Sequence, residues 1–158
     1  MRGEVASTIQ YVMKKFEALT AGELYRILKL RQEVFIIEQT CIYSDIDGKD
    51  ETAYHLMAFD GDSVVGCLRI LGRGISFDAV SVGRVVVPAR HRGRGIAKEM
   101  MGAALDFIRR ELREKQIKLS AQTYATGFYE GLGFVRASEE YLEDDIPHVD
   151  MVCTLAEG

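Results

Sequence analysis

The sequence predicts a mixed α+β domain, and three observations support that prediction. Residues 21–39 place apolar side chains three and four positions apart, which is the spacing of an amphipathic helix. Two apolar runs, 53–59 and 63–71, are joined by Asp-Gly-Asp, a turn suited to an antiparallel hairpin. Residues 79–123 read as strand, glycine-spaced turn, helix and strand, an order that implies a right-handed parallel crossover. We therefore expect a sheet that is antiparallel early, parallel later, and covered by helices.

Shorter signals define the remaining elements. Residues 11–19 alternate enough to form a first strand, and Thr20 and Glu23 have the spacing of a capping box at the start of the first helix. On that helix, Arg31 and Glu33 are expected on the wetter side. The sequence also predicts a helix over 96–115, a strand over 117–123, a short helix over 125–132, and strands that begin at Phe134 and cover 149–155.

The stretch 41–51 shows no periodicity and is predicted to be a polar loop. The loop is expected to be a solvated surface segment. The alternative is that its acidic residues attract a positively charged substrate; these residues are Asp45, Asp47, Asp50 and Glu51. Calcium is disfavoured, because an EF-hand needs a longer loop between two helices and a strand follows here. No metal site is predicted.

Length and composition fit a single domain that covers residues 1–158. The chain is 47% hydrophobic, contains two prolines, and is too short for two comfortable cores. It has no internal repeats and no linker-like segment. One continuous unit is the simplest organisation.

Charge and cysteine usage narrow the class of protein. A net charge of −4 disfavours general binding of nucleic acid, which depends on excess Lys and Arg. Cys41, Cys67 and Cys153 lack the Cys-x-x-Cys spacing of zinc or redox sites, so we expect reduced thiols and a cytoplasmic protein. No apolar run approaches the roughly 20 residues that span a bilayer, so no membrane partner is expected.

Residues 84–97 read RVVVPARHRGRGIA and are predicted to form an anion-binding turn. Pro88 cannot continue a central ladder, so the strand should end there. A helix start offers unpaired N–H groups, and Gly93 and Gly95 let a phosphate approach the main chain. A solvated helix cap is the alternative. The dinucleotide fingerprint lacks its third glycine here, and the P-loop its Lys-Ser/Thr pair. Positive charge around the turn comes from Arg90, Arg92 and Arg94.

Two segments resemble the signatures of the GNAT superfamily of N-acetyltransferases. Arg90-x-x-Gly93-x-Gly95 is similar to the family's Gln/Arg-x-x-Gly-x-Gly/Ala, and residues 128–134, FYEGLGF, are similar to its Phe-Tyr-x-x-x-Gly-Phe. The resemblance implies a central twisted, mixed but mostly antiparallel sheet of about seven strands, with about four flanking helices. It also implies acetyl coenzyme A as the acyl donor. The residues implied to bind it are Val85, Val86, Val87, Arg90, Arg92, Gly93, Arg94, Gly95, Ile96 and Ala97.

The amino-terminal half sharpens this resemblance. Residues 30–39, LRQEVFIIEQ, and the positions that follow as far as His55 look like the ElaA-like subgroup, as does the segment 146–151, IPHVDM. The resemblance thus covers nearly the whole chain. A looser likeness around residues 34–39 extends to acyl-homoserine-lactone synthases, so the length of the acyl chain stays open.

The reaction implied is direct acyl transfer in a ternary complex, without a covalent enzyme intermediate. A primary amine of a small molecule or peptide attacks the thioester, and a main-chain N–H near Val87 polarises its carbonyl oxygen. Tyr129 gives a proton to the departing thiolate. The general base is less defined: Glu38 and His55 are the main candidates, and His148, Asp150 or water are alternatives.

Three alternatives remain at this stage. Tyr129 could be a packing residue within an aromatic cluster. Cys41, with His55 and Asp47, could form a covalent acyl-transfer centre, although no local motif activates the thiol. The chain could also be a non-catalytic module that binds coenzyme A or a protein partner. The acceptor and the oligomeric state are open, with a homodimer as one arrangement.

Overall fold

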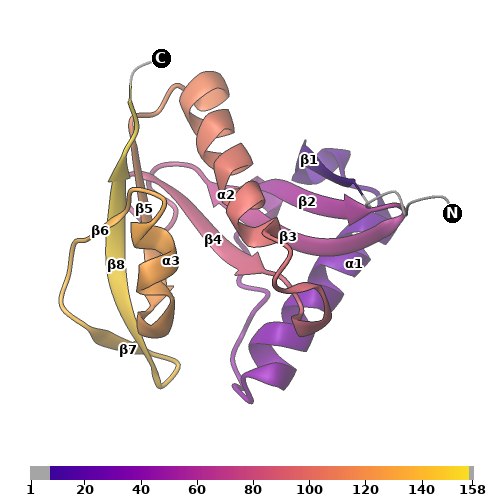
Figure 1. Ribbon diagram of the computed structural model, residues 1–158, viewed down its shortest axis with the longest axis horizontal. Coiled ribbons are helices and arrows are strands. Elements are labelled where there is room, and N and C mark those ends of the chain that lie inside the picture. Colours follow the sequence, from indigo (N-terminus) through magenta and orange to yellow (C-terminus); the bar gives the residue numbers. More distant parts are fainter. Residues whose placement is uncertain (1–7, 157–158) are drawn as a thin grey trace, which may run out of the picture.

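The computed structural model describes residues 8–156 and shows one sheet with helices on both faces (Figure 1). The strand order is β1-β2-β3-β4-β5-β8-β6, and β7 pairs with β8 outside this path. All pairings are antiparallel except β4 with β5. The strands are β1 Ile9–Lys15, β2 Tyr54–Asp60, β3 Ser63–Leu71, β4 Val80–Val86, β5 Gln116–Gln122, β6 Val135–Arg136, β7 Tyr141–Glu143 and β8 Ile146–Thr154.

The helices are α1 Ala21–Arg31, α2 Ile96–Phe107 and α3 Thr126–Glu130. α1 continues as a π-helix over Gln32–Glu38, and α2 continues as one over Ile108–Leu112. The mixed, mostly antiparallel architecture is confirmed, with eight strands and three α-helices within the described residues. The additional strand is β7, which is three residues long and mostly exposed, so no apolar alternation marks it in the sequence.

The first strand begins and ends earlier in the sequence than predicted. β1 ends at Lys15, and a 3-10 turn over Phe16–Ala18 replaces the second half of the predicted strand. The capping box is confirmed, because the Glu23 N–H donates to Thr20 Oγ1 over 3.0 Å and the Thr20 N–H donates to Glu23 Oε1 over 2.9 Å. Since this cap starts α1 at Ala21, the chain has to turn before it.

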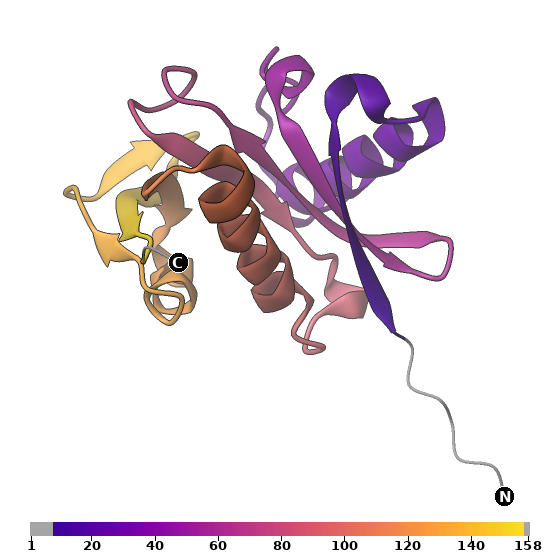
Figure 2. The ribbon, with the colours of Figure 1, turned by 90° about the horizontal axis from the view of Figure 1, so that it is seen from above.

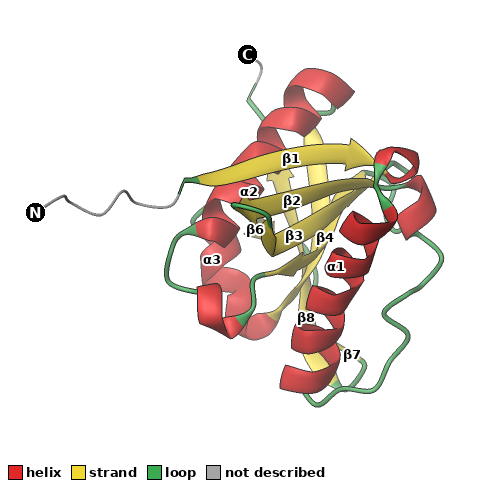
Figure 3. Ribbon diagram, turned by 90° about the vertical axis from the view of Figure 1, so that its right-hand side faces the viewer, coloured by secondary structure: helices red, strands yellow, loops and turns green. Residues whose placement is uncertain are grey.

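α1 and α2 lie on opposite faces of the sheet (Figure 2 and Figure 3), and each face carries its own core. One face is covered by α2, whose Met100, Met101 and Ala104 are fully buried against the central strands. The other face is covered by α1 and its π-helical extension, which bury Ile27 and Val34. The predicted helical spacing is therefore confirmed as the pattern that packs both helices onto the sheet.

β4 and β5 separate soon after they meet. Their parallel pairing consists of Val80 with Ile117 and Ser81 with Lys118. Beyond this point β4 stays with β3 and β5 stays with β8, so the sheet opens into two arms (Figure 1). A β-bulge in β4 accompanies the separation: Arg84 has a φ of +51°, which is rare for a residue with a side chain.

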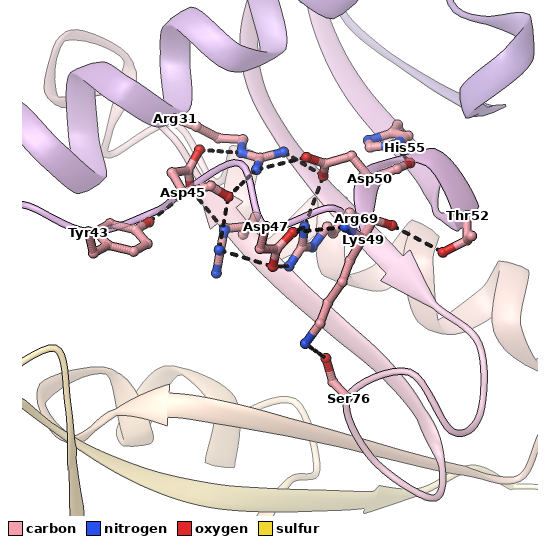
Figure 4. Close-up of polar contacts among 11 residues, drawn as sticks. Arg31, Tyr43, Asp45, Asp47, Lys49, Asp50, Thr52, His55, Arg69 and Ser76 are labelled. Carbon is pink, nitrogen blue, oxygen red and sulfur yellow. Dashed lines mark hydrogen bonds and ion pairs between the residues drawn. The ribbon is translucent and has the colours of Figure 1, made fainter.

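Arg31 is buried, so its predicted place on the wetter side of the helix is wrong. Its side chain is 1% exposed. Its Nε lies 2.8 Å from Asp45 Oδ2, and its Nη1 lies 2.7 Å from Asp50 Oδ1 (Figure 4). A buried guanidinium is tolerated where its donors are satisfied, and Nη2 also donates to the main-chain oxygen of Asp45. Charge pairing therefore outweighs the helical pattern at this position.

The acidic loop belongs to the same buried cluster, so its prediction as a solvated segment is wrong for Asp45 and Asp50, each 6% exposed. Arg69 pairs with Asp50 over 2.9 Å and with Asp47 over 2.6 Å. Arg84 Nε lies 2.8 Å from Asp45 Oδ1. Three guanidinium groups thus balance three carboxylates. Because they are already paired, the three aspartates of the loop do not present free negative charge to a cationic acceptor, and Glu51 is the acidic residue of the loop that stays exposed.

The arginines also set the protonation state of this cluster. Burial by itself raises the pKa of Asp47 and Asp50, but hydrogen bonds and charge from the arginines outweigh burial and hold both pKa values below the ordinary range. Arg69 acts on both carboxyls, Arg31 on Asp50, and Arg84 on Asp47. Asp47 and Asp50 therefore stay charged and, through the arginines, hold the loop that connects α1 to β2 in place.

Removal of one cation from this cluster should destabilise the fold. We expect Arg31→Ala to lower the free energy of unfolding by about 3–5 kcal/mol, because it removes one of the two arginines that pair with each of the buried carboxylates Asp45 and Asp50. The matched control is Arg26→Ala on the exposed side of α1, for which we expect a change within about 0.5 kcal/mol. Urea denaturation measures both, and equal, small effects would contradict a structural role of the cluster.

Candidate active site

The opening between β4 and β5 contains a cleft of about 790 Å³. Val85 of β4 lines one wall and Ser120 of β5 lines the other. Tyr129 of α3 and Ala97 at the start of α2 also face it, as do residues of the β7–β8 hairpin. The cleft therefore lies where a parallel pair of strands separates and a helix begins, a common place for ligands in sheets with parallel crossovers.

The cleft edge of β4 carries main-chain groups without a strand partner. Within residues 8–156, no strand pairs with this edge after Ser81, although β3 continues to pair with the opposite edge as far as Val86. Such an edge can receive an extended, amide-containing ligand in the way another strand would pair with it. Of the three valines singled out in the sequence, Val85 lines the cleft, whereas Val86 and Val87 are 2% and 9% exposed.

The glycine turn has the conformation that the sequence predicts. Gly93 and Gly95 have φ values of +84° and +75°, and Gly95 is the N-cap of α2 without a side-chain cap. A Cβ placed on either glycine would meet no atom within 4 Å, so the space above the main chain is open. The first turn of α2, which contains Ile96 and Ala97, thus directs its N–H groups toward unfilled space.

The arginines of the turn are all paired. Arg90 pairs with Glu33, Arg92 Nη2 lies 2.9 Å from Glu38 Oε2, and Arg94 Nη2 lies 3.0 Å from Asp60 Oδ2. Their carboxylate partners come from the π-helix and from the end of β2. The positive charge expected from the sequence is thus balanced locally, which leaves the main chain as the principal donor set for an anion.

Arg92 also joins the turn to the end of β4, because its Nε donates to the main-chain oxygen of Val87 over 2.8 Å. The same guanidinium pairs with Glu38. The turn is therefore held between the strand that enters it and the helix on the opposite face of the sheet.

Tyr129 lies inside the cleft within an aromatic cluster. Its ring packs edge-on against Phe128 and Phe134, with centroids 5.1 and 5.8 Å away. Its hydroxyl makes no hydrogen bond to any residue between 8 and 156. Burial raises the pKa of Tyr129 to about 12, so the phenol is protonated at neutral pH. A protonated phenol aimed at an open cleft can donate to a ligand.

The candidate bases do not lie together. His55 is 1% exposed, donates a hydrogen bond from Nε2 to the main-chain oxygen of Asp50 over 2.8 Å, and does not line the cleft. Burial lowers the pKa of His55, which keeps the ring neutral. Glu38 pairs with Arg92 outside the cleft lining. His148 and Asp150, the alternatives from the last strand, both line the cleft.

The suggested cysteine centre is not assembled. Cys41 lines the cleft, but its thiol contacts the main-chain oxygen of Asp144 over 3.6 Å. His55 is buried beside Asp50, and Asp47 is paired with Arg69 and Arg84. Neither His55 nor Asp47 is therefore placed to activate the thiol.

The sequence did not predict two polar contacts among the residues that line the cleft. Gln39, at the end of the π-helix, and Gln122, at the end of β5, exchange amide hydrogen bonds of 3.2 and 3.4 Å. Tyr141 and Ser120 are also in contact there, although they belong to different strands. These pairs are 83 and 21 residues apart in sequence, so no local pattern could have brought them together.

The geometry agrees with comparisons to known proteins. The family described as Acetyltransferase (GNAT) domain matches residues 17–155. Protein ElaA of Escherichia coli is 36% identical over 135 residues, which cover 84% of this chain and 88% of ElaA. The chain belongs to the GNAT acetyltransferase family. The predicted family and the ElaA-like resemblance are thus confirmed, and the protein is an enzyme of the acyltransferase class.

Solved structures lead to the same GNAT fold. The crystal structure of Escherichia coli ElaA superposes with a TM-score of 0.86 at 33% identity, covering 92% of this chain and 99% of that one. An acyl-CoA N-acyltransferase from Pseudomonas aeruginosa superposes with a TM-score of 0.84 at 37% identity, covering 93% and 100%. Within residues 8–156 of this GNAT chain, no helix is long and apolar enough to cross a membrane.

Gly95→Ala tests the turn as the anion site of this GNAT domain. We expect the Kd for coenzyme A to rise at least about tenfold, because a side chain at positive φ costs about 1–2 kcal/mol and enters the open space above the turn. Gly74→Ala is the matched control, since Gly74 has a φ of +83° and equally open surroundings in the β3–β4 loop. Titration calorimetry measures both affinities, and an equal loss in the control would contradict the assignment.

Proposed function

We propose that the protein transfers an acetyl group from acetyl coenzyme A to a primary amine of a small molecule or peptide. The observation that carries this proposal is the cleft itself. Ala97, in the helix turn that directly follows the glycine turn, Val85 of the unpaired edge of β4, and Tyr129 all line one opening. Their order matches the order of groups along the donor, which has a diphosphate, an amide-rich arm and a terminal thioester. The three cysteines are free thiols, in keeping with a cytoplasmic enzyme.

In this proposal the main chain holds the donor. N–H groups of Gly93, Gly95 and the first turn of α2 bind the diphosphate, and the open edge of β4 pairs with the pantetheine arm. Arg90, Arg92 and Arg94 keep the turn in place through their carboxylate partners. A main-chain recognition of this kind leaves the carbonyl carbon of the thioester near the point where β4 and β5 separate.

Transfer then proceeds by direct attack in a ternary complex. The amine nitrogen forms a bond to the acyl carbon, and the N–H near Val87 polarises the carbonyl oxygen. The C–S bond breaks as Tyr129 gives its proton to the sulfur, and the phenol later regains a proton from solvent. A base must accept the proton that the nitrogen loses. His55 is buried and hydrogen-bonded away from the cleft, and Glu38 is held by Arg92, so polar groups within the cleft are better placed.

A longer acyl chain is the second candidate for the donor. The cleft volume of about 790 Å³ leaves room for more than an acetyl group. Two solved structures that share the fold at low identity, the AHL synthase LasI at 17% and the N-acyl amino acid synthase FeeM at 13%, are named as enzymes of acyl transfer. Acetyl and longer acyl coenzyme A thioesters therefore belong in the same assay.

The test of the proposed function is release of free thiol from acetyl coenzyme A in the presence of polyamines, amino acids, aminoglycosides and peptide amino termini. Turnover with at least one primary amine is the expected result. Tight binding of acetyl coenzyme A without turnover of any amine would favour a non-catalytic binding module instead. Cys41→Ser should keep near-normal turnover, because the mechanism forms no acyl-enzyme.

Tyr129→Phe is the sharpest variant for this mechanism. We expect kcat to fall about 10²- to 10³-fold, because the thiolate leaves without a proton donor, while the Kd for acetyl coenzyme A stays within about twofold. The ring and its contacts with Phe128 and Phe134 are preserved in this variant. Unchanged kcat would show that Tyr129 is a packing residue.

A further inference from the structure

Strand register places three hydroxyl and carboxyl groups side by side in the cleft. Ser120 of β5 lies directly opposite Asp150 of β8, so their side chains share one face of the sheet. Tyr141 of β7 lies opposite His148, which is two residues from Asp150 on the same face. All four side chains line the cleft. This cluster belongs to the arm of the sheet that carries β5, away from the buried arginine network.

The hydrogen bonds among these groups have a defined direction. The Tyr141 hydroxyl donates to Asp150 Oδ1 over 2.7 Å, and it contacts Ser120 Oγ as well. A phenol has one proton, and that proton is already directed to the carboxylate. Tyr141 must therefore accept from Ser120, so the serine hydroxyl donates to the tyrosine oxygen. The remaining lone pairs of Ser120 are then free to accept a proton from the cleft.

The chain Ser120–Tyr141–Asp150 also has a way out to solvent. Asp150 is partly exposed, and Tyr141 is half-buried above it. Burial, aided by the hydrogen bond and negative charge of Asp150, raises the pKa of Tyr141 to about 12, so the phenol stays protonated. His148 stacks on the Tyr141 ring at 6.1 Å and bonds through Nδ1 to the main-chain oxygen of Ile146 over 2.7 Å, which fixes both rings.

We propose that Ser120, Tyr141 and Asp150 form a proton relay that serves as the general base of this enzyme. The inference rests on the proposed function and deepens it, because that mechanism leaves the base open. Its location fits the need, since Ser120 and Tyr129 line the same cleft from β5 and from the helix after it. The arrangement lets a partly exposed carboxylate act on a nitrogen that it does not touch.

Each step of the relay is balanced. As the N–C bond forms, the nitrogen becomes strongly acidic and an N–H bond breaks toward Ser120 Oγ. Ser120 passes its own hydroxyl proton to the Tyr141 oxygen, and Tyr141 passes its proton to Asp150. The carboxylate becomes a carboxylic acid, which returns to the charged form by releasing one proton to water. Each hydroxyl ends with one proton, and no residue changes its net charge except Asp150, briefly.

The relay should respond as a unit to substitution. Acceptor turnover is measured with acetyl coenzyme A and the primary amine that is turned over fastest in the panel described above. We expect Ser120→Ala and Tyr141→Phe each to lower kcat about 10²-fold with the Kd for acetyl coenzyme A within about twofold. The double variant should lose no more than either single one, because members of one relay are not additive. Additive losses would overturn the proposal.

A matched control separates relay chemistry from the position of β8. Ser138→Ala removes a serine hydroxyl that accepts from the main-chain N–H of Asp150, without touching its carboxylate. We expect kcat to stay within about twofold of the wild type. A loss as large as that of Ser120→Ala would show that the strand position, and not proton transfer, accounts for the activity.

The pH profile supplies a second readout. Among the described residues, the titratable groups that face the relay are Glu143 of β7 and His148 of β8. Lys118 of β5 places its Nζ over the Phe77 ring instead. We expect the acidic limb of kcat/KM to disappear in Asp150→Asn, since that variant has no carboxylate to be protonated, and to persist in His148→Gln. The reverse pattern would assign the base to His148 and overturn the relay.

A spectroscopic measurement tests the hydrogen bonds without any substrate. In protein labelled with ¹³C at tyrosine Cζ, we expect the Tyr141 resonance to shift as Asp150 is protonated and to lose that shift in Asp150→Asn. A Tyr141 resonance that ignores Asp150 would overturn the relay even if the enzyme is active. A wild-type protein that turns over no amine fails the proposed function instead, so the two failures are distinguishable.

Discussion

The parallel pairing of β4 and β5 lasts for two residue pairs, and every other feature of the cleft depends on this early separation. If this pairing continued, β5 would form hydrogen bonds with the main-chain groups of β4 that now face the cleft. The glycine turn would then lie against β5. Because the strands separate, the cleft has main-chain groups on its β4 wall and polar side chains on its β5 wall. The helices α1 and α2 still bury their apolar side chains against the two faces of the sheet, so the cleft does not interrupt the cores.

The buried arginine–aspartate cluster holds together the part of the sheet that forms the β4 wall of the cleft. Charge burial is costly and contributes little net stability when pairing is good, so such a cluster is better understood as a device for specific geometry. It ties the loop before β2 to the bulge at Arg84, where the backbone of β4 leaves its regular path. Several of its members, among them Asp47, Arg69 and Arg84, also line the cleft. The network therefore forms part of the cleft wall.

The other arm has a different chemistry. β5 and β8 place Ser120, Gln122, His148 and Asp150 on the cleft face, and the short strand β7 adds Tyr141. None of these side chains is locked in an ion pair with an arginine, in contrast to the aspartates of the first arm. The β4 side of the cleft therefore presents main-chain groups and paired charges, and the β5 side presents polar side chains, which is the division of roles that the proposed mechanism needs.

Local patterns in the sequence were sufficient for much of the fold. Helical spacing, the Asp-Gly-Asp turn, the capping box at Thr20 and the glycine turn at Gly93 and Gly95 each depend on neighbours within a few residues, and all four appear in the structure. The prediction failed at Arg31, because whether a charged side chain is buried depends on partners 14 and 19 residues away. It also placed the end of the first strand too late, since local alternation continues past the turn that the cap requires.

The sequence by itself determined the elements, their order, the glycine turn and the family, because these depend on short-range spacing that a linear chain displays. Tertiary structure alone decided which polar residues share the cleft. His55 and Glu38 looked suitable by type, yet burial and ion pairing engage them elsewhere. Ser120, Tyr141 and Asp150 carry no common motif, and they meet only because β5, β7 and β8 pair in one register. Contacts across strands depend on that register, and no pattern along a single strand encodes it.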